Sequence, residues 1–218
     1  MNPTFDQLIE HYANYTRDVY RHLHANPELS YQEIETSAYI RRELASMNIP
    51  FRAGIAGTGI LGVIEGKNPK KKIIALRADM DALPVEEKNN VPYKSKNANV
   101  MHACGHDAHT ACLLGVAQVL NQLKTDFEGT VLLIFQPGEE KAPGGAFLML
   151  QDGIFNEYKP QMIIAQHVSV DYPTGTLAFL PEKLWHQPMK FMLRLKVRAD
   201  TELYRIFVMI RYWQLRKQ

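Results

Sequence analysis

The sequence contains little cysteine, no long apolar run and no excess of charge of one sign. Its two cysteines, Cys104 and Cys112, favour a reducing, cytoplasmic location over a disulfide framework. No apolar run approaches the roughly 18 residues that a membrane-spanning helix needs, and the first residues do not resemble a secretory signal. We therefore expect a protein without a membrane partner.

Charge is almost balanced along the chain. The 218 residues include 25 Lys and Arg and 23 Asp and Glu, which gives a formal net charge of +2. No basic stripe or acidic tail is present, and this argues against a nucleic-acid partner. An apolar fraction of 46% is ample for a packed core. These features indicate a globular protein that acts on a small molecule or a peptide.

The spacing of apolar residues predicts an α/β fold. Helical periodicity predicts helices at residues 4–24, 31–47 and 109–123, with a short helix starting at 144–146. Short apolar runs predict strands at residues 59–64, 72–78, 130–135 and 162–165. Turn residues at 66–69 predict that the first two strands form a hairpin.

Side chains suited to metal chemistry follow three of these strands. Asp79 ends one strand, Glu139 and Glu140 follow another, and His167 ends a third. In α/β sheets ligands bind at the carboxyl ends of strands. We therefore expect these side chains to converge on one site.

Residues 102–109 hold three histidines, a cysteine and an aspartate. Cys104 and His106 are two apart on an irregular segment, so both can point into one cavity. Glu140 and His167 can add oxygen and nitrogen donors, and a mixed S/N/O set suits Zn²⁺ or Mn²⁺. Taken alone, these eight residues can also be a helix cap with ordinary polar side chains, but the glutamate pair and His167 favour a metal site.

The adjacent Glu139 and Glu140 face different ways on an extended or turn segment. One can bind a metal while the other exchanges a proton with a metal-bound water. The alternative is a pair of solvated surface glutamates without a role in the site. Asp79 can hold a ligand imidazole through its free ring nitrogen, or it can be a simple strand-end turn residue.

Other polar residues near these motifs have less specific roles. Asp107, His102 and His109 are expected to line the site rather than bind metal, and Cys112 is expected in the core. Taken alone, His22, His24 and Glu28 are typical of a polar helix end.

Together the motifs resemble the co-catalytic metallopeptidase superfamily of aminoacylases and carboxypeptidases. The resemblance is to its amidohydrolase branch, which includes hippurate hydrolases, auxin-conjugate hydrolases, N-acetyldiaminopimelate deacetylases and N-acyl-L-amino acid amidohydrolases. It covers about residues 15–180. The segments that carry it, in the family's order, are residues 21–30, 57–59, 77–84, 101–109, 135–140 and 144–146, and His167.

The resemblance implies a two-metal site with Zn²⁺, Mn²⁺ or Co²⁺. Its implied ligands are Cys104, His106, Glu140 and His167, with Glu139 as the general base and Asp79 orienting the ligand chemistry. The implied reaction is hydrolysis of the amide bond of an N-acyl amino acid. A metallo-exopeptidase acting on dipeptides and a non-catalytic metal-binding module are the alternatives, and metal stoichiometry separates enzyme from module.

The resemblance also implies a three-layer catalytic domain with a central mixed sheet. In the family a smaller lid domain interrupts this domain and mediates dimerisation. We interpret residues 1–183 as the N-terminal part of the catalytic domain. The lid and a further histidine ligand have no counterpart, so we expect weak or absent activity.

Residues 184–218 do not resemble the family as they stand. Read in a shifted frame with permitted codons, they yield a Gly-Lys-Gly-Gly-His-Gly segment that resembles the start of the family's lid. We therefore interpret them as an out-of-frame remnant of that domain. The alternative is a genuine short ending with a strand at 191–197 and a helix at 202–215.

Overall fold

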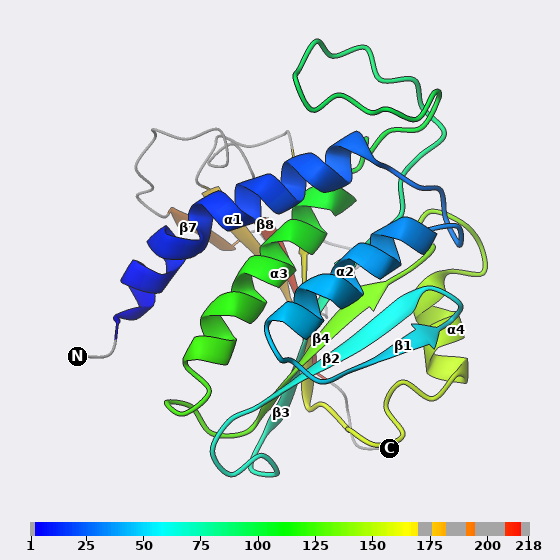
Figure 1. Cartoon of the computed structure of the whole chain (residues 1–218). Coiled ribbons are helices and arrows are strands. Elements are labelled where there is room, and N and C mark those ends of the chain that lie inside the picture. The colour runs from blue at the N-terminus through cyan, green and yellow to red at the C-terminus, as the bar shows by residue number, and fades with distance from the viewer. Residues whose placement is uncertain (1–2, 170–175, 182–190, 195–207, 215–218) are drawn as a thin grey trace.

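The computed structural model describes residues 3–169, 176–181, 191–194 and 208–214. Strands and helices alternate from residue 73 to residue 167 (Figure 1). The helices are α1 (Phe5–Ala25), α2 (Ile34–Ser46), α3 (His106–Gln122) and α4 (Gly145–Gln151). The strands are β1 (Phe51–Ile55), β2 (Gly59–Glu65), β3 (Ile73–Asp79), β4 (Thr130–Gln136), β5 (Met162–His167), β6 (Thr176–Pro181), β7 (Phe191–Arg194) and β8 (Val208–Gln214).

The strands form one mixed sheet in the order β1-β2-β4-β3-β5-β8-β6-β7. The central strands β4, β3 and β5 run parallel, while β2 runs antiparallel to β4. Parallel neighbours need crossover connections, and α3 supplies the one between β3 and β4. The α/β class and the mixed central sheet expected from the sequence are thus confirmed.

The predicted hairpin between residues 59–64 and 72–78 is wrong, because β4 lies between β2 and β3. The connection after β2 bonds instead to the segment that leads into β4, where Lys67 N donates to Phe127 O. All seven residues of β4 are buried. A strand that is bonded on both edges and covered on both faces suits such an apolar sequence. A local turn signal cannot reveal a partner strand that comes much later in the chain.

The helix that the alternative interpretation placed at residues 202–215 is also wrong in its described part. Val208–Gln214 is strand β8, which pairs with β5 and β6. Its sequence, VMIRYWQ, is rich in β-branched and aromatic residues, which favour strands. The shifted reading frame concerns residues 184–218, most of which lie outside the described residues, and it stays a prediction.

Alternation along β4 divides the core between the two faces of the sheet. Val131, Leu133 and Phe135 face the cluster that contains α1, α2 and α3. Leu132 and Ile134 face a smaller cluster with Met149 of α4. This period of two is that of a strand whose side chains point to opposite faces. Figure 1 shows α1, α2 and α3 packed together on one side of the sheet.

The fold brings the carboxyl ends of three parallel strands to one edge, next to the start of α3. β3 ends at Asp79, β4 leads into residues 137–140, and β5 ends at His167. α3 starts beside them because Gly105, its N-cap, adopts a left-handed φ of 83°. No helix in the described part of the chain is long and apolar enough to cross a bilayer.

Candidate metal centre

His106, the first residue of α3, is fully buried and lies at the centre of the candidate site. Its Nδ1 lies 2.8 Å from the backbone oxygen of Asp81 and 3.3 Å from Asp81 Oδ1. A carbonyl oxygen can only accept, so Nδ1 carries a proton and donates it. His106 Nε2 is buried and has no hydrogen-bond partner among the described residues. A buried imidazole with one nitrogen fixed and the other unpartnered is what a metal ligand requires.

Negative charge surrounds this imidazole. Asp79 Oδ2 lies 3.6 Å from Nε2, and Glu140 Oε1 lies 3.8 Å from it. Burial alone would lower the pKa of His106, but its hydrogen bond to Asp81, the neighbouring Cys104 and the charge of Asp79 raise it to about 11. The site therefore favours a positive charge at His106, which a proton or a divalent cation can supply.

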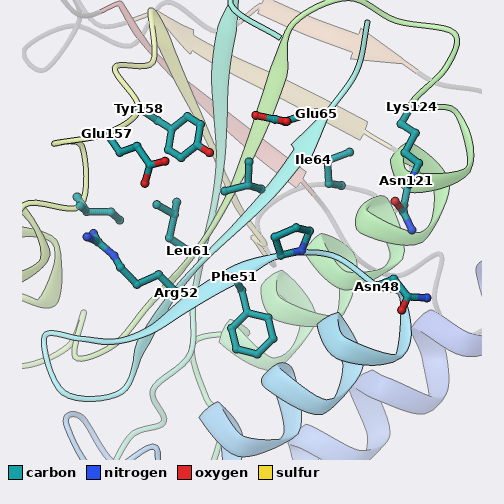
Figure 2. Close-up of a pocket in the computed structure, with 13 residues that line it drawn as sticks. Asn48, Phe51, Arg52, Leu61, Ile64, Glu65, Asn121, Lys124, Glu157 and Tyr158 are labelled. Carbon is teal, nitrogen blue, oxygen red and sulfur yellow. The ribbon is translucent and has the colours of Figure 1, made fainter.

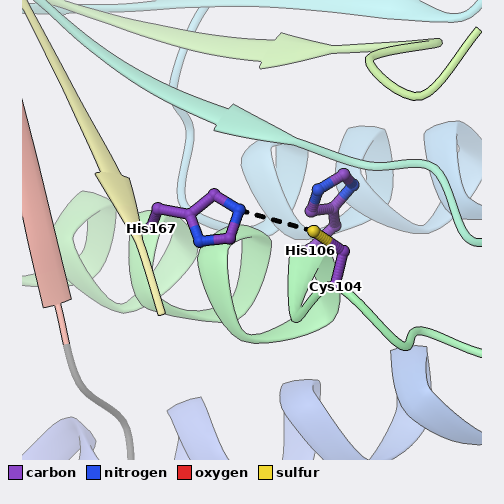
Figure 3. A group of neighbouring side chains, drawn as sticks. All are labelled: Cys104, His106 and His167. Atoms are coloured by element: carbon purple, nitrogen blue, oxygen red, sulfur yellow. Dashed lines mark hydrogen bonds between the residues drawn. The ribbon is translucent and has the colours of Figure 1, made fainter. Parts of the chain in front are cut away.

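Cys104 and His167 form a second part of the site. Cys104 Sγ lies 3.4 Å from His167 Nε2, and Figure 3 shows the two side chains turned toward each other beside His106. The neighbouring imidazoles of His106 and His167 lower the pKa of the Cys104 thiol, which favours the thiolate that binds metal. Ligand atoms of these three residues lie within 4.8 Å of one another.

Glu139 and Glu140 form a third part with His106, again with ligand atoms within 4.8 Å. Both glutamates are exposed, and the turn that carries them is anchored at two points. Gly138 N donates to Glu33 Oε1 at 2.8 Å, and Glu140 N donates to Asp81 Oδ2 at 3.0 Å. The buried anchors hold the turn in place while its carboxylates reach the solvent side of the site.

Asp79 lies in the site, but its short hydrogen bonds do not go to a predicted ligand. Its Oδ1 accepts from His109 Nδ1 at 2.6 Å, and its Oδ2 accepts from Arg77 Nη1 at 2.6 Å. Burial opposes ionisation, yet Arg77 and His109 hold the pKa of Asp79 well below its usual range. Asp79 is therefore an ionised carboxylate that reaches His106 only at the 3.6 Å contact.

Sequence reasoning missed two buried carboxylates, Asp81 and Glu33, that organise the site. Asp81 faces the Nδ1 of His106 and accepts from Ser30 Oγ at 2.6 Å. Despite burial, its hydrogen bonds with His106 and Ser30 lower its pKa to about 2. Asp81 lies in segment 77–84, which carries the family resemblance, but nothing in the sequence assigned it a separate role. Glu33 follows segment 21–30 by three residues and carried no signal of its own.

His24 lies in the last turn of α1, so the expected polar helix end is confirmed. Its side chain is buried between two carboxylates, with Nδ1 2.6 Å from Asp107 Oδ2 and Nε2 3.1 Å from Glu87 Oε1. Both ring nitrogens donate, so His24 is an imidazolium. His22 at the same helix end is exposed, whereas the carboxylate of Glu28 accepts from two backbone N–H groups in the first turn of α2. His24 thereby ties α1 to the first turn of α3, next to the candidate ligands.

The remaining polar residues line the site or lie beneath it. His109 is fully buried with both ring nitrogens bonded, to Asp79 and to the backbone N–H of Val168. His102 is buried, and neither of its ring nitrogens has a partner within the described residues. Desolvation raises the pKa of the half-buried Cys112 thiol to about 11, which favours the protonated thiol over the thiolate.

A separate pocket of about 460 Å³ lies at the sheet edge formed by β1 and β2 (Figure 2). Arg52, Glu65, Lys124 and Tyr158 are among the residues that line it. None of the candidate metal ligands contributes to this lining. The clustering of donors, rather than the presence of a hollow, therefore locates the functional site.

The chain is similar to several known proteins. Residues 75–206 match the model of peptidase family M20/M25/M40. The chain is 38% identical over 175 residues to an N-acyl-L-amino acid amidohydrolase of Geobacillus stearothermophilus, covering 80% of this chain and 46% of that protein. It is 44% identical over 158 residues to an N-acetylcysteine deacetylase of Bacillus subtilis, covering 72% of this chain and 40% of that protein.

A solved structure is also similar. The YXEP protein of Bacillus subtilis, described as a dinuclear metal binding peptidase, superposes with a TM-score of 0.72 at 40% identity, covering 78% of this chain and 46% of that one. The chain thus spans about half the length of the relatives it matches. The match to the family model covers more than half of the 218 residues. On this evidence the chain belongs to peptidase family M20/M25/M40.

Proposed function

We propose that this site binds two divalent metal ions and that it hydrolyses the amide bond of N-acyl amino acids. The observation that carries the proposal is His106 Nε2, which is buried, unpartnered within the described residues and common to every candidate ligand group. The relatives named as amidohydrolase and deacetylase support the reaction, and the neighbour named as dinuclear supports the metal number.

The residues present fit such ions. Cys104, His106 and His167 offer sulfur and nitrogen donors, and Glu140 adds an oxygen near His106. This mixed set suits Zn²⁺, Mn²⁺ or Co²⁺. When bound, such ions polarise the amide carbonyl and lower the pKa of a coordinated water. The hydrogen bond from His106 Nδ1 to the backbone oxygen of Asp81 holds the ring in the orientation that leaves Nε2 free.

Glu139 is the group that we propose to move the proton. It stands beside Glu140 on the exposed side of the site, where a substrate can reach it. Its carboxylate takes a proton from water as the water oxygen bonds to the acyl carbon. It then delivers this proton to the amide nitrogen as the C–N bond breaks, which releases a carboxylic acid and an amino acid.

Metal titration followed by a hydrolysis assay tests the proposal. We expect the purified chain to bind two equivalents of Co²⁺ or Zn²⁺, and Glu139→Gln to keep this binding while losing any hydrolysis of N-acetyl or N-benzoyl amino acids. Glu10→Gln, an exposed change on α1, is the matched control. Binding of no metal by the unmodified chain contradicts the metal site.

The same assay separates the substrate classes. Turnover of dipeptides with a free amino group in place of N-acyl amino acids would replace the proposed substrate class with that of an exopeptidase. If the chain binds two metals but turns over neither class of substrate, the metal-site proposal stands and the proposed catalysis is refuted for this chain. The expectation of weak activity from the sequence is decided by the same measurement.

A further inference from the structure

A continuous chain of hydrogen bonds runs from a buried carboxylate to one of the proposed ligands. Asp79 Oδ1 lies 2.6 Å from His109 Nδ1, and His109 Nε2 accepts from Val168 N at 2.9 Å. The carbonyl oxygen of the same residue, Val168, lies 2.6 Å from His167 Nδ1. His167 Nε2 then faces Cys104 Sγ at 3.4 Å. The chain therefore connects β3, α3 and the end of β5.

The hydrogen-bonding roles along this chain follow from chemistry. A backbone N–H can only donate, so His109 Nε2 must be an unprotonated acceptor, and His109 Nδ1 carries the proton that Asp79 accepts. A carbonyl oxygen can only accept, so His167 Nδ1 carries a proton, and Nε2 is left as the ring nitrogen that can bind a metal. The ring of His167 therefore presents the nitrogen that a metal needs toward Cys104.

Packing holds the same two segments together. A Cβ atom on Gly105 would lie 2.2 Å from Val168 Cγ2, so Val168 fits against the start of α3 only because residue 105 is glycine. The backbone that carries His167 therefore packs closely against the segment that carries Cys104 and His106. Two separate contacts fix the position of Val168: its side chain packs against Gly105, and its backbone N–H donates to His109.

We propose that His109 is a positioning residue, which acts with Asp79 through the backbone of Val168 to fix the orientation and tautomer of His167. The inference rests on the proposed metal centre. His109 is not itself a ligand, although it lies within 4.8 Å of Asp79 and His106, because both of its ring nitrogens are already used. Partners of this kind commonly strengthen a metal site 10–100-fold.

The tautomer is tested directly on the metal-free chain. Long-range ¹H–¹⁵N NMR correlations of the histidine rings distinguish a protonated from an unprotonated ring nitrogen. We expect the Nε2 of His109 to be the unprotonated nitrogen and to accept from Val168 N–H. A protonated Nε2 on His109 would overturn the proposal, because it could not accept this bond.

Three substitutions test the positioning role. An Asn side chain places its amide near the Nδ1 position and can donate to Asp79, whereas Gln reaches the Nε2 position and can accept from Val168 N–H. We expect His109→Leu and His109→Asn to weaken Co²⁺ binding about 10–100-fold and to reduce the cysteine-to-cobalt charge-transfer band. His109→Gln should retain most of the affinity.

Leu114→Ala is the matched control for a purely structural effect. Leu114 lies on the same helix, fully buried in the core. We expect this change to lower the melting temperature without altering cobalt affinity. Equal cobalt binding by the unmodified chain and His109→Leu would overturn the inference. Absence of cobalt binding by the unmodified chain would instead remove the metal centre, and with it the positioning role.

Discussion

Replacing Asp81 with asparagine separates its role in stability from its role in orienting His106. Asp81 Oδ2 accepts from Ser30 Oγ at 2.6 Å and from Glu140 N at 3.0 Å. An amide oxygen at this position would turn two charge-assisted bonds into neutral ones, at a cost of about 1 kcal/mol each. We therefore expect Asp81→Asn to reduce the free energy of unfolding by about 2 kcal/mol.

The effect on the affinity of the metal site should be of similar size. The new NH₂ group at the Oδ1 position would face His106 Nδ1–H, so that two donors oppose each other. A shift of the ring proton to Nε2 would remove this conflict, but it would set the Nδ1 lone pair against the backbone oxygen of residue 81 and block the nitrogen that a metal requires. We expect the affinity for Co²⁺ to fall about 10–100-fold, which is about 1.4–2.8 kcal/mol.

Urea unfolding and a chelator-buffered cobalt titration measure the two effects. Ser30→Ala is the matched control, because it removes one hydrogen bond to Asp81 and leaves the carboxylate opposite His106 unchanged. It should cost about 1 kcal/mol in stability without weakening cobalt binding. Cobalt binding by Asp81→Asn as tight as that of the unmodified chain would refute the orientation argument.

Two further predictions concern the start of α3 and the buried imidazolium. Gly105→Ala should destabilise the chain by about 1–3 kcal/mol, because the φ of residue 105 is 83° and a Cβ there would overlap Val168. Urea unfolding measures this change, and unchanged stability would contradict the close approach of Val168. Burial opposes protonation of His24, but Asp107 and Glu87 raise its pKa above the usual 6.5. Its stabilising contribution should therefore be complete below about pH 6.5 and fade as pH rises through the raised folded-state pKa. His24→Gln should remove this pH dependence from unfolding curves, and identical curves would contradict it.

Local patterns predicted the elements because period and burial are local properties. The helical spacing of residues 109–123 identified α3, and the apolar run at 130–135 identified β4. The prediction that Asp79, the glutamate pair and His167 would lie at one edge followed from their places at strand ends. Strand order was not predictable in this way, since β4 enters between β2 and β3 from a distant part of the chain.

The buried hydrogen-bond network around the site could not be predicted either, because its members are distant in sequence. His24 meets partners that are 83 and 63 residues away, so its neighbours in sequence suggested only a polar helix end. Asp79 and Asp81 both follow β3, and which of them faces the Nδ1 of His106 depends on how α3 is docked. Sequence spacing thus located the donors, whereas the hydrogen bonds that orient them came from tertiary packing.

The balance of buried charge gives a physical reason for a cation at His106. Asp79, Asp81, Glu87 and Asp107 are at most 4% exposed, and buried carboxylates are tolerated only when donors or positive charges meet them. Arg77 meets Asp79, and His24 meets both Glu87 and Asp107. Asp81 meets His106, whose Nε2 lacks a partner within the described residues. A divalent ion at that nitrogen adds positive charge where the carboxylates gather, so its binding should also stabilise the folded chain.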